Sequence, residues 1–393
     1  MKDRCILWGA GKIGQSIIST INTIYEIYAF CDNEKLKWGG VIGNIPIISP
    51  DELKQLCYED KIDCIIISVK KEEHINQIRK ALLGILPEKI DVLDGIEFIN
   101  GQQNDYLIKV RNTLQYHWEI DFESQASIWI QNFMSEVKFW IHDVANPEGI
   151  FRLDYNNRLF NLEFVKLDGS CASLASMLDE NSIVMDIGCG LVSKYGKRLP
   201  NSKEIQLLAI DPLAAFYNII NEKYLSGRSS DKCCHFGMFE FMANFFAENY
   251  SDAIIINNAL DHCIDPYKSI IECLYILKKG GIIHLNHRRA EAVFENYHGL
   301  HKWNIDYDNN NNFVIWNNEN AVNVSQCLKD IADIKVTHSD DHLVRSEQFV
   351  IVDIVKLDDF NLEKFFDIKK DMHYLTSFIE NLMDWIAHNV SVS

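Results

Sequence analysis

Twice along the chain, a buried apolar strand runs directly into a glycine-rich turn, and this arrangement restricts the fold more than any other feature. Residues 4–8 are followed by Gly9-Ala-Gly11-Lys-Ile-Gly14, after which isoleucines recur at helical spacing. Residues 182–187 run into a second glycine turn, which gives Asp186-Ile-Gly188-Cys-Gly190. Further apolar strands and helical intervals follow. Strands that alternate with helices favour parallel sheets covered on both faces. We therefore predict an α/β chain with two doubly wound Rossmann-like domains.

The length of 393 residues also fits two domains. We place the first at 1–100, a helical bridge with a linker at 101–160, the second domain at 161–357 and a helical tail at 358–393. In the bridge, apolar residues between Ile130 and Val144 follow the spacing of an amphipathic helix. Residues 145–160 are rich in Asn, Gly and Pro, which indicates a linker. The tail should pack on the body or across a homodimer.

The charge balance excludes several classes of partner. Lys and Arg number 38 against 56 Asp and Glu, for a net charge of −18, so we expect no binding to nucleic acid or to anionic membranes. The sequence contains no run of eighteen apolar residues, so we predict no membrane span, and no signal peptide is apparent. The eleven cysteines form no C-x-x-C pair. We expect reduced thiols, no zinc site and a cytoplasmic protein that acts on small molecules.

The first glycine turn has the features of a nucleotide cradle. Asp32 closes the second strand, eighteen residues after Gly14. Such glycines let the backbone approach a diphosphate, the helix start supplies amide donors, and the acid accepts from a ribose hydroxyl. A cradle does not specify a reaction, so two alternatives stay open. The turn could serve only strand–helix packing, or the chain could be an NAD(P)-dependent oxidoreductase.

A resemblance narrows this choice. Residues 4–100, with "ILWGAGKIG" and "FCDNEKLKWGGVIGNIPIISPDEL", are similar to N-terminal Rossmann-like domains of bacterial sugar-modifying proteins. These include the nucleotide-sugar-binding domain of sugar N-acyltransferases. The resemblance implies that Gly9, Gly11, Gly14 and Asp32 hold a nucleotide or a nucleotide sugar.

The second domain carries an ordered set of signals. After Asp186-Ile-Gly188-Cys-Gly190, Asp211 closes the next strand, "NALDHCIDP" follows a later strand, and "LKKGG" precedes another. This order resembles class I S-adenosylmethionine (SAM)-dependent methyltransferases of the bacterial type-11-like group. The resemblance implies that the glycines leave room for the methionine part of SAM, Asp186 orients its amino group and Asp211 accepts from the ribose hydroxyls. It further implies that the adenine contacts Met238 and Phe239, and that Asn257 and Asn258 lie below the methyl donor. A fold that binds a nucleotide without turnover is the alternative.

Residues 284–304 hold four histidines, two arginines and a lysine in an otherwise acidic chain. The segment directly follows a predicted strand end, so it should face the methyl group. A hydroxyl acceptor needs a base, and histidine titrates near neutral pH. The candidate bases are His287 and His301, with His262 as a third. Arg288 and Arg289 would bind an anionic acceptor and Tyr297 and Trp303 would close over it, unless the cluster is structural.

A metal site is the remaining possibility in this region. The run Asn258-Ala-Leu-Asp261-His262 resembles the Glu-x-x-Glu-His of quinone-type O-methyltransferases, in which the acids and the histidine bind a divalent metal. Here Asn and Asp replace the two Glu residues, and we therefore predict no metal.

Taken together, these signals predict a SAM-dependent methyltransferase. Its substrate would be a hydroxyl of a small anionic, nucleotide-linked sugar or a related intermediate of bacterial surface-glycan synthesis. The competing classes are an NAD(P)-dependent oxidoreductase, which would bind NADH, and a non-catalytic nucleotide-binding protein, which would show no affinity for SAM.

Overall fold

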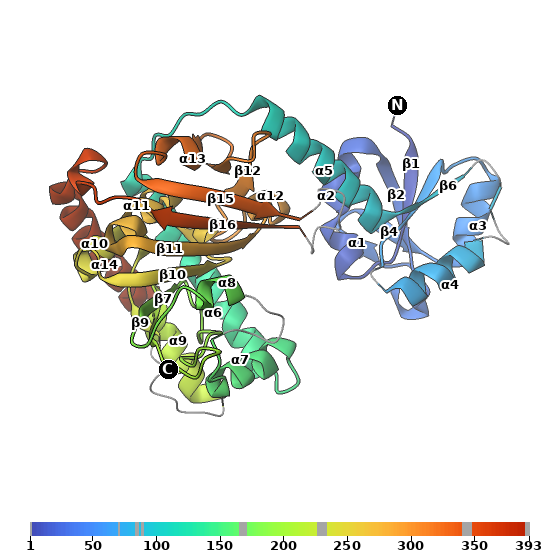
Figure 1. Cartoon of the computed structure of the whole chain (residues 1–393). Coiled ribbons are helices and arrows are strands. Elements are labelled where there is room, and N and C mark those ends of the chain that lie inside the picture. The colour runs from blue at the N-terminus through green and yellow to red at the C-terminus, as the bar shows by residue number, and fades with distance from the viewer. Residues whose placement is uncertain are drawn as a thin grey trace. The chain divides into compact units, whose positions relative to one another are not determined.

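The computed structural model describes residues 2–69, 71–82, 86–87, 90–164, 171–225, 234–339 and 348–389. The chain divides after Val110 into two compact units, later than the predicted boundary at residue 100. Each unit has its own largely parallel sheet with helices (Figure 1), which confirms the predicted α/β class. No helix in the described part of the chain is long and apolar enough to cross a membrane.

The sheet of the first unit has the strand order β3-β4-β2-β1-β5-β6. The chain leaves β1 for β2 on one side and returns to β5 on the other, so the strand order reverses between β1 and β5. The strands are β1 (Arg4–Trp8), β2 (Glu26–Cys31), β3 (Val41–Ile42), β4 (Ile45–Ile48), β5 (Cys64–Ile67) and β6 (Asp91–Asp94). The helices are α1 (Lys12–Ser16), α2 (Ile18–Ile24), α3 (Pro50–Tyr58), α4 (Glu72–Leu82) and α5 (Gly95–Thr113).

The sheet of the second unit has the order β15-β16-β11-β10-β7-β8-β9 (Figure 1). All neighbours pair in parallel except β16, which is antiparallel to both β11 and β15. The chain runs from β7 outward to β8 and β9 and then returns to β10 on the other side of β7, and ligands bind at such a reversal. The strands are β7 (Ile183–Ile187), β8 (Gln206–Asp211), β9 (His235–Phe236), β10 (Ser251–Asn257), β11 (Leu277–Arg288), β15 (Ala332–His338) and β16 (Phe349–Lys356).

Helix α6 (Phe122–Ala145) packs against the C-terminal helix α14 (Ile368–Asn389), and aromatic pairs join them. Phe122 stacks on Tyr374, and Trp129 meets Phe378 edge to face. The predicted tail helix therefore supports the predicted bridge helix. The other helices of this unit are α7 (Ile150–Phe160), α8 (Ala172–Ala175), α9 (Ala214–Tyr224), α10 (Met242–Phe245), α11 (Pro266–Ile276), α12 (Glu291–Phe294) and α13 (Val324–Cys327).

Three local features differ from the sequence-based expectations. Residues 150–160, predicted as a linker, form α7, because burial of Tyr155 and Leu159 outweighs the turn-forming composition. The run "LKKGG", predicted to precede a strand, lies within β11 and forms a bulge there, since Ser251 pairs with Leu277 and Ala253 already pairs with Ile282. An antiparallel sheet, which the sequence analysis did not identify, consists of β12 (Asn304–Tyr307), β13 (Phe313–Trp316) and β14 (Ala321–Asn323).

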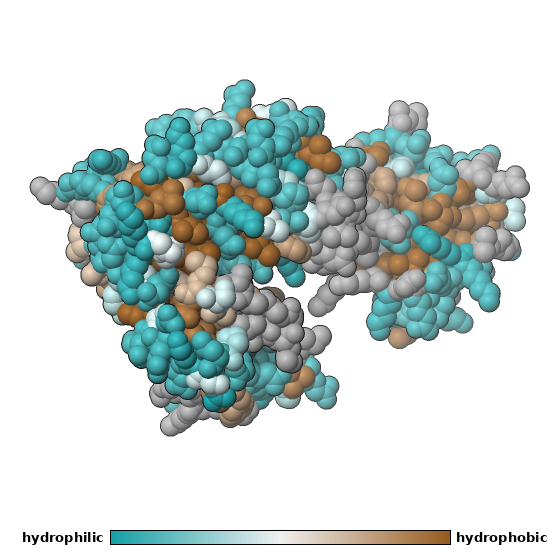
Figure 2. Space-filling view, in the orientation of Figure 1, coloured by the Kyte–Doolittle hydropathy of each residue, from teal (hydrophilic) through white to brown (hydrophobic). Residues whose placement is uncertain are grey.

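The surface and the described cysteines can be compared with the composition of the chain. Hydrophilic residues cover much of the face of the second unit that Figure 2 shows. Among the described cysteines, all are free and only Cys327 is exposed.

Candidate functional site

One cavity lies at the carboxyl ends of β7, β8 and β10, where the strand order of the second sheet reverses. Of the residues predicted to bind SAM, Gly188, Asp211, Met238 and Phe239 line this cavity, and the candidate base His262 lines it as well. The described residues that line it are Trp129, Glu136, Gly188, Asp211, Pro212, Leu213, Tyr217, Met238, Phe239, Glu240, Ala259, His262, Cys263 and Leu300.

The turn after β7 tolerates no side chain at its first glycine. Gly188 has a φ of +71°, and a Cβ there would lie 2.4 Å from the Cβ of Ala259 and 3.2 Å from the ring of Phe239. Gly190 also has a positive φ, of +67°. The turn thus packs closely against the segments after β9 and β10, which brings these walls of the cavity together.

Asp211 ties this turn to the end of β8. One carboxylate oxygen accepts from the backbone N–H of Leu213 at 2.9 Å, and the other accepts from Gly190 at 3.1 Å. Burial raises the pKa of Asp211 to about 7 against the effect of these two amides, and the carboxylates of Glu136 and Asp186 add to the rise. Asp186 is itself buried at the end of β7, outside the lining.

The cavity fits a cationic ligand with an aromatic ring and hydroxyl groups. Its lining includes the carboxyls of Glu136, Asp211 and Glu240, and none of its described residues is a lysine or arginine. Met238 and Phe239 supply an apolar wall. SAM carries a sulfonium, ribose hydroxyls and an adenine, so the donor and acceptor set of this lining suits it.

Two cavity residues come from α6 and were not predicted. The indole N–H of Trp129 donates to the backbone oxygen of His262 at 3.0 Å, and Glu136 accepts from the indole of Trp140 at 2.7 Å. Glu136 lies seven residues after Trp129, on the same stripe as the buried Phe133. A carboxylate within an apolar helical stripe was the available signal. Burying a charge costs free energy, so a glutamate at such a position indicates a function.

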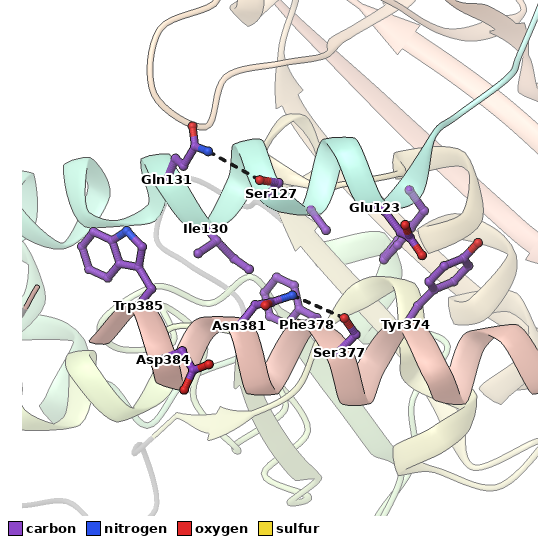
Figure 3. A pocket seen from close by; sticks show the side chains of 12 residues that line it. Glu123, Ser127, Ile130, Gln131, Tyr374, Ser377, Phe378, Asn381, Asp384 and Trp385 are labelled. Carbon is purple, nitrogen blue, oxygen red and sulfur yellow. Dashed lines mark hydrogen bonds between the residues drawn. The ribbon is translucent and has the colours of Figure 1, made fainter. Parts of the chain in front are cut away.

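Helices α6 and α14 line a second hollow between them (Figure 3). Trp385 and Tyr374 extend from α14 toward α6, beside Ile130 and Phe378. None of the predicted site residues lines it.

The structure does not bring Asn257 and Asn258 into the cavity lining. The side-chain oxygen of Asn257 accepts from the ammonium of Lys194 at 2.6 Å, and its amide donates to the hydroxyl of Tyr195 at 2.7 Å. Asn258 has a φ of +47°, and its side-chain oxygen accepts from the backbone N–H of Arg288 at 2.9 Å. Both asparagines therefore hold neighbouring protein segments together.

The three candidate histidine bases converge on one fully buried carboxylate, that of Asp261. His287 Nε2 lies 2.8 Å from Oδ1 of Asp261, and His301 Nδ1 lies 2.6 Å from Oδ2. His262 Nε2 lies 3.7 Å from Oδ2 and 3.1 Å from His301 Nδ1. Burial alone would raise the pKa of Asp261, but the adjacent histidines hold it well below its ordinary value.

The structure corrects the assignment of His287 as a base. Its ring is fully buried, with Nε2 facing Asp261 and Nδ1 facing the backbone oxygen of Arg288 at 2.6 Å. Both partners are acceptors, so both ring nitrogens must carry a proton and the ring is an imidazolium. Burial alone would lower the pKa of His287, but Asp261 raises it. No ring nitrogen is left for a substrate.

His301 and His262 remain partly accessible, at 24% and 22% of their side-chain surface. Burial alone would lower the pKa of His301, but the hydrogen bond and charge of Asp261 raise it to about 9. Of the two, only His262 belongs to the cavity lining.

Two of the predicted acceptor-binding residues are buried structural groups, which corrects their assignment. Arg289 is 1% exposed and donates through Nε to Asp306 at 2.7 Å. The indole of Trp303 donates to the backbone oxygen of Cys263 at 2.9 Å. The side chain of Arg288 is 55% exposed, and Tyr297 is half-buried, so these two remain candidates.

In the first unit, the fold itself explains most of the glycine turn. A Cβ on Gly14 would lie 2.0 Å from the backbone oxygen of Gly9, and Gly9 has a φ of +125°. Gly11 differs, because its φ is −87° and a Cβ at this position would have no atom of the described chain within 4 Å. Packing does not require a glycine there, whereas close approach of a ligand would.

Asp32 organises the loop around this turn. Its carboxylate accepts from the backbone N–H groups of Ala10 and Glu34, both at 2.9 Å, and from the ammonium of Lys37 at 3.1 Å. Burial would raise the pKa of Asp32, but these hydrogen bonds and the charge of Lys37 lower it. A ribose would therefore have to share an already bonded carboxylate.

Comparison with known proteins finds two matching families. Residues 1–90 match the family described as C2185-like, N-terminal, and residues 185–285 match a methyltransferase domain. No curated protein matches the chain.

Many solved structures match as well. A putative sarcosine dimethylglycine methyltransferase from Galdieria sulphuraria is 12% identical with a TM-score of 0.35, covering 54% of this chain and 88% of its own. A SAM-dependent methyltransferase from Thermotoga maritima, described as a possible histamine N-methyltransferase, is 13% identical with a TM-score of 0.31, covering 59% and 99%. UDP-D-quinovosamine 4-dehydrogenase from Vibrio fischeri is 19% identical with a TM-score of 0.20, covering 26% and 87%. Similarities at these TM-scores do not indicate the activity of this chain.

The methyltransferase match covers the end of β7, all of β8 and β10 and most of β11. It therefore includes the three strand ends at which the cavity lies. The second unit thus contains a SAM-dependent methyltransferase domain, as its motifs predict.

Proposed function

We propose that this protein transfers the methyl group of SAM to a hydroxyl of a small anionic, nucleotide-linked sugar in bacterial surface-glycan synthesis. The observation that carries the proposal is the cavity in which Gly188 and Asp211 share a lining with His262. Bound there, SAM supplies a methyl group activated by its sulfonium.

The roles of the chain's own residues follow from their positions. Asp211 and Glu136 hold the hydroxyl-bearing and cationic parts of the cofactor, and Met238 with Phe239 contact its adenine. His262 removes the proton of the acceptor hydroxyl, since it lines the cavity and lies 3.1 Å from His301. Asp261 orients His301 and is itself balanced by His287. The exposed guanidinium of Arg288 provides positive charge for an anionic acceptor.

The sugar-nucleotide part of the proposal concerns the first unit. It is supported by Gly11, whose lack of a side chain the packing does not explain, and by the resemblance of residues 4–100 to nucleotide-sugar-binding domains. The first unit would then bind a nucleotide or a nucleotide sugar.

The affinity for SAM is expected to rise with pH between about 6 and 8, because Asp211 has a pKa of about 7 without cofactor. Below this value the carboxyl is protonated and neutral, and above it the carboxylate can accept from hydroxyls and attract a cation. One such hydrogen bond to a charged group is worth about 1.5–3 kcal/mol, which is roughly tenfold or more in affinity. Calorimetric titration of SAM at several pH values measures this dependence.

Asp211→Asn should reduce the pH dependence and lower the affinity at pH 8. Glu240→Gln is the matched control, since the pKa of Glu240 is also raised to about 7 by burial in the same cavity. If Asp211→Asn binds SAM like the wild type across the range, Asp211 does not contact the cofactor.

Gly11→Val is expected to abolish binding of a nucleotide diphosphate or nucleotide sugar to the first unit, while the thermal unfolding midpoint changes little. The reason is that the valine side chain would occupy open space that only a ligand needs. Titration of UDP, of UDP-sugars and of NADH into wild type and variant measures the effect. Gly101→Val, at an exposed position of α5 that is also open and has no positive φ, is the control. NADH oxidation that Gly11→Val eliminates would favour the oxidoreductase alternative.

A further inference from the structure

Three potential ligand atoms lie together beside the cofactor cavity. They are Oδ2 of Asp261, Nε2 of His262 and Nδ1 of His301, and all lie within 4.8 Å of one another. Their separations are 2.6 Å between His301 and Asp261, 3.1 Å between the two histidines and 3.7 Å between His262 and Asp261. The residues come from the segment after β10 and from the loop before β12.

We propose that Asp261, His262 and His301 form a binding site for one divalent metal ion of the zinc class, contrary to the absence of a metal expected from the sequence. A point about 2.0–2.1 Å from all three atoms exists for a triangle with these sides, which is the usual distance from zinc to nitrogen and oxygen ligands. That point lies outside the plane of the three atoms, as the ion does in a tetrahedral site.

The chemistry of the ligand set selects the kind of ion. Two imidazole nitrogens and one carboxylate suit Zn²⁺, Co²⁺ or Fe²⁺, whereas Mg²⁺ and Ca²⁺ prefer oxygen ligands alone. Asn258 takes no part, because its side-chain oxygen accepts from the backbone of Arg288. The ligand set therefore differs from the run 258–262 considered on sequence grounds, and His301 supplies the third ligand.

Surrounding groups hold the ligands in place, as they do in metal sites generally. His287 donates to Oδ1 of Asp261, and the side chains of both residues are fully buried. Oδ2 faces His301 Nδ1 at 2.6 Å, so the ion would replace the proton that these two atoms share. The backbone oxygen of His262 accepts from the indole of Trp129. Because His262 lines the cofactor cavity, the ion would lie where it can acidify an acceptor hydroxyl. With the ion bound, His262 would hold the ion and would not itself remove the proton. That effect on the hydroxyl rests on the proposed function, but metal binding itself does not.

Cobalt binding to the full chain tests the proposal without SAM or an acceptor. After treatment with a chelator, the protein is titrated with Co²⁺ and its visible absorption bands are recorded, and Zn²⁺ is then added as a competitor. We expect one equivalent of Co²⁺ per chain, bands of a low-coordinate site, and displacement by Zn²⁺.

His262→Ala and His301→Ala should each reduce Co²⁺ affinity by more than the about 10–100-fold that loss of a supporting residue costs. His298→Ala, an exposed histidine in the same segment, should bind Co²⁺ like the wild type. Thermal unfolding of each variant checks that it is folded, and a separate SAM titration of the same preparations reports on the cofactor site. Absence of Co²⁺ binding by the wild type, or equal binding by all three variants, would overturn the proposal even if SAM binds.

Discussion

Asp261→Ala is expected to destabilise the folded protein by about 3–5 kcal/mol, the range for removing one partner of a buried ion pair. The side chains of Asp261 and His287 are both fully buried at a separation of 2.8 Å. Both nitrogens of His287 face acceptors, so the ring is charged, and the variant would leave that charge in the interior without a counter-ion. Urea denaturation of wild type and variant measures the free energy of unfolding.

A double-mutant cycle separates the charge from the packing. Asp261→Asn keeps the shape of the side chain but removes its charge, and we expect it to be nearly as destabilising as alanine. His287→Gln in the Asp261→Asn background should then recover part of the loss, because both buried charges are gone. If Asp261→Asn were as stable as the wild type, His287 would be neutral and its hydrogen bonding would differ from that described.

His262→Ala is expected to lower turnover by about 10²–10⁴-fold with nearly unchanged affinity for SAM, the usual cost of removing a general base. The expectation follows from its place in the cavity lining, next to the glycine turn and Phe239. Formation of S-adenosylhomocysteine with a panel of nucleotide sugars measures turnover, and calorimetry measures SAM binding.

His301→Ala is the comparison for this assignment. If His301→Ala alone abolishes turnover, the base is His301, and if both variants do, the two histidines act as a unit. If neither does, the acceptor needs no histidine, and the cluster serves structure or binds the acceptor.

The parts of the molecule that short sequence segments determine could be predicted. Short, mostly aliphatic runs such as Cys64–Ile67 and Ile183–Ile187 identify strands of a parallel sheet. A glycine turn and an acid at consecutive strand ends place Gly188 and Asp211 at one edge, because parallel strands share the edge at which they end. Their roles toward SAM stay predictions until binding is measured.

The parts that depend on partners distant in sequence could not be predicted. Charge density alone suggested that Arg289 binds a substrate, but Asp306, seventeen residues later on β12, neutralises it in the interior. The candidate bases were identified individually, whereas their convergence on Asp261 requires β11 and the loop before β12 to meet the segment after β10. Glu136 reaches the cavity only because α6 packs across this edge of the unit.

The central claim is that the cavity at the reversal of the second sheet binds SAM, and calorimetric titration of SAM into the wild-type protein and Asp211→Ala tests it most directly. We predict one site per chain in the wild type, competition by S-adenosylhomocysteine but not by NADH, and an affinity at least about tenfold lower in the variant, from the loss of hydrogen bonds to a charged group. No binding of SAM to the wild type, or equal affinities in the two proteins, would contradict the account.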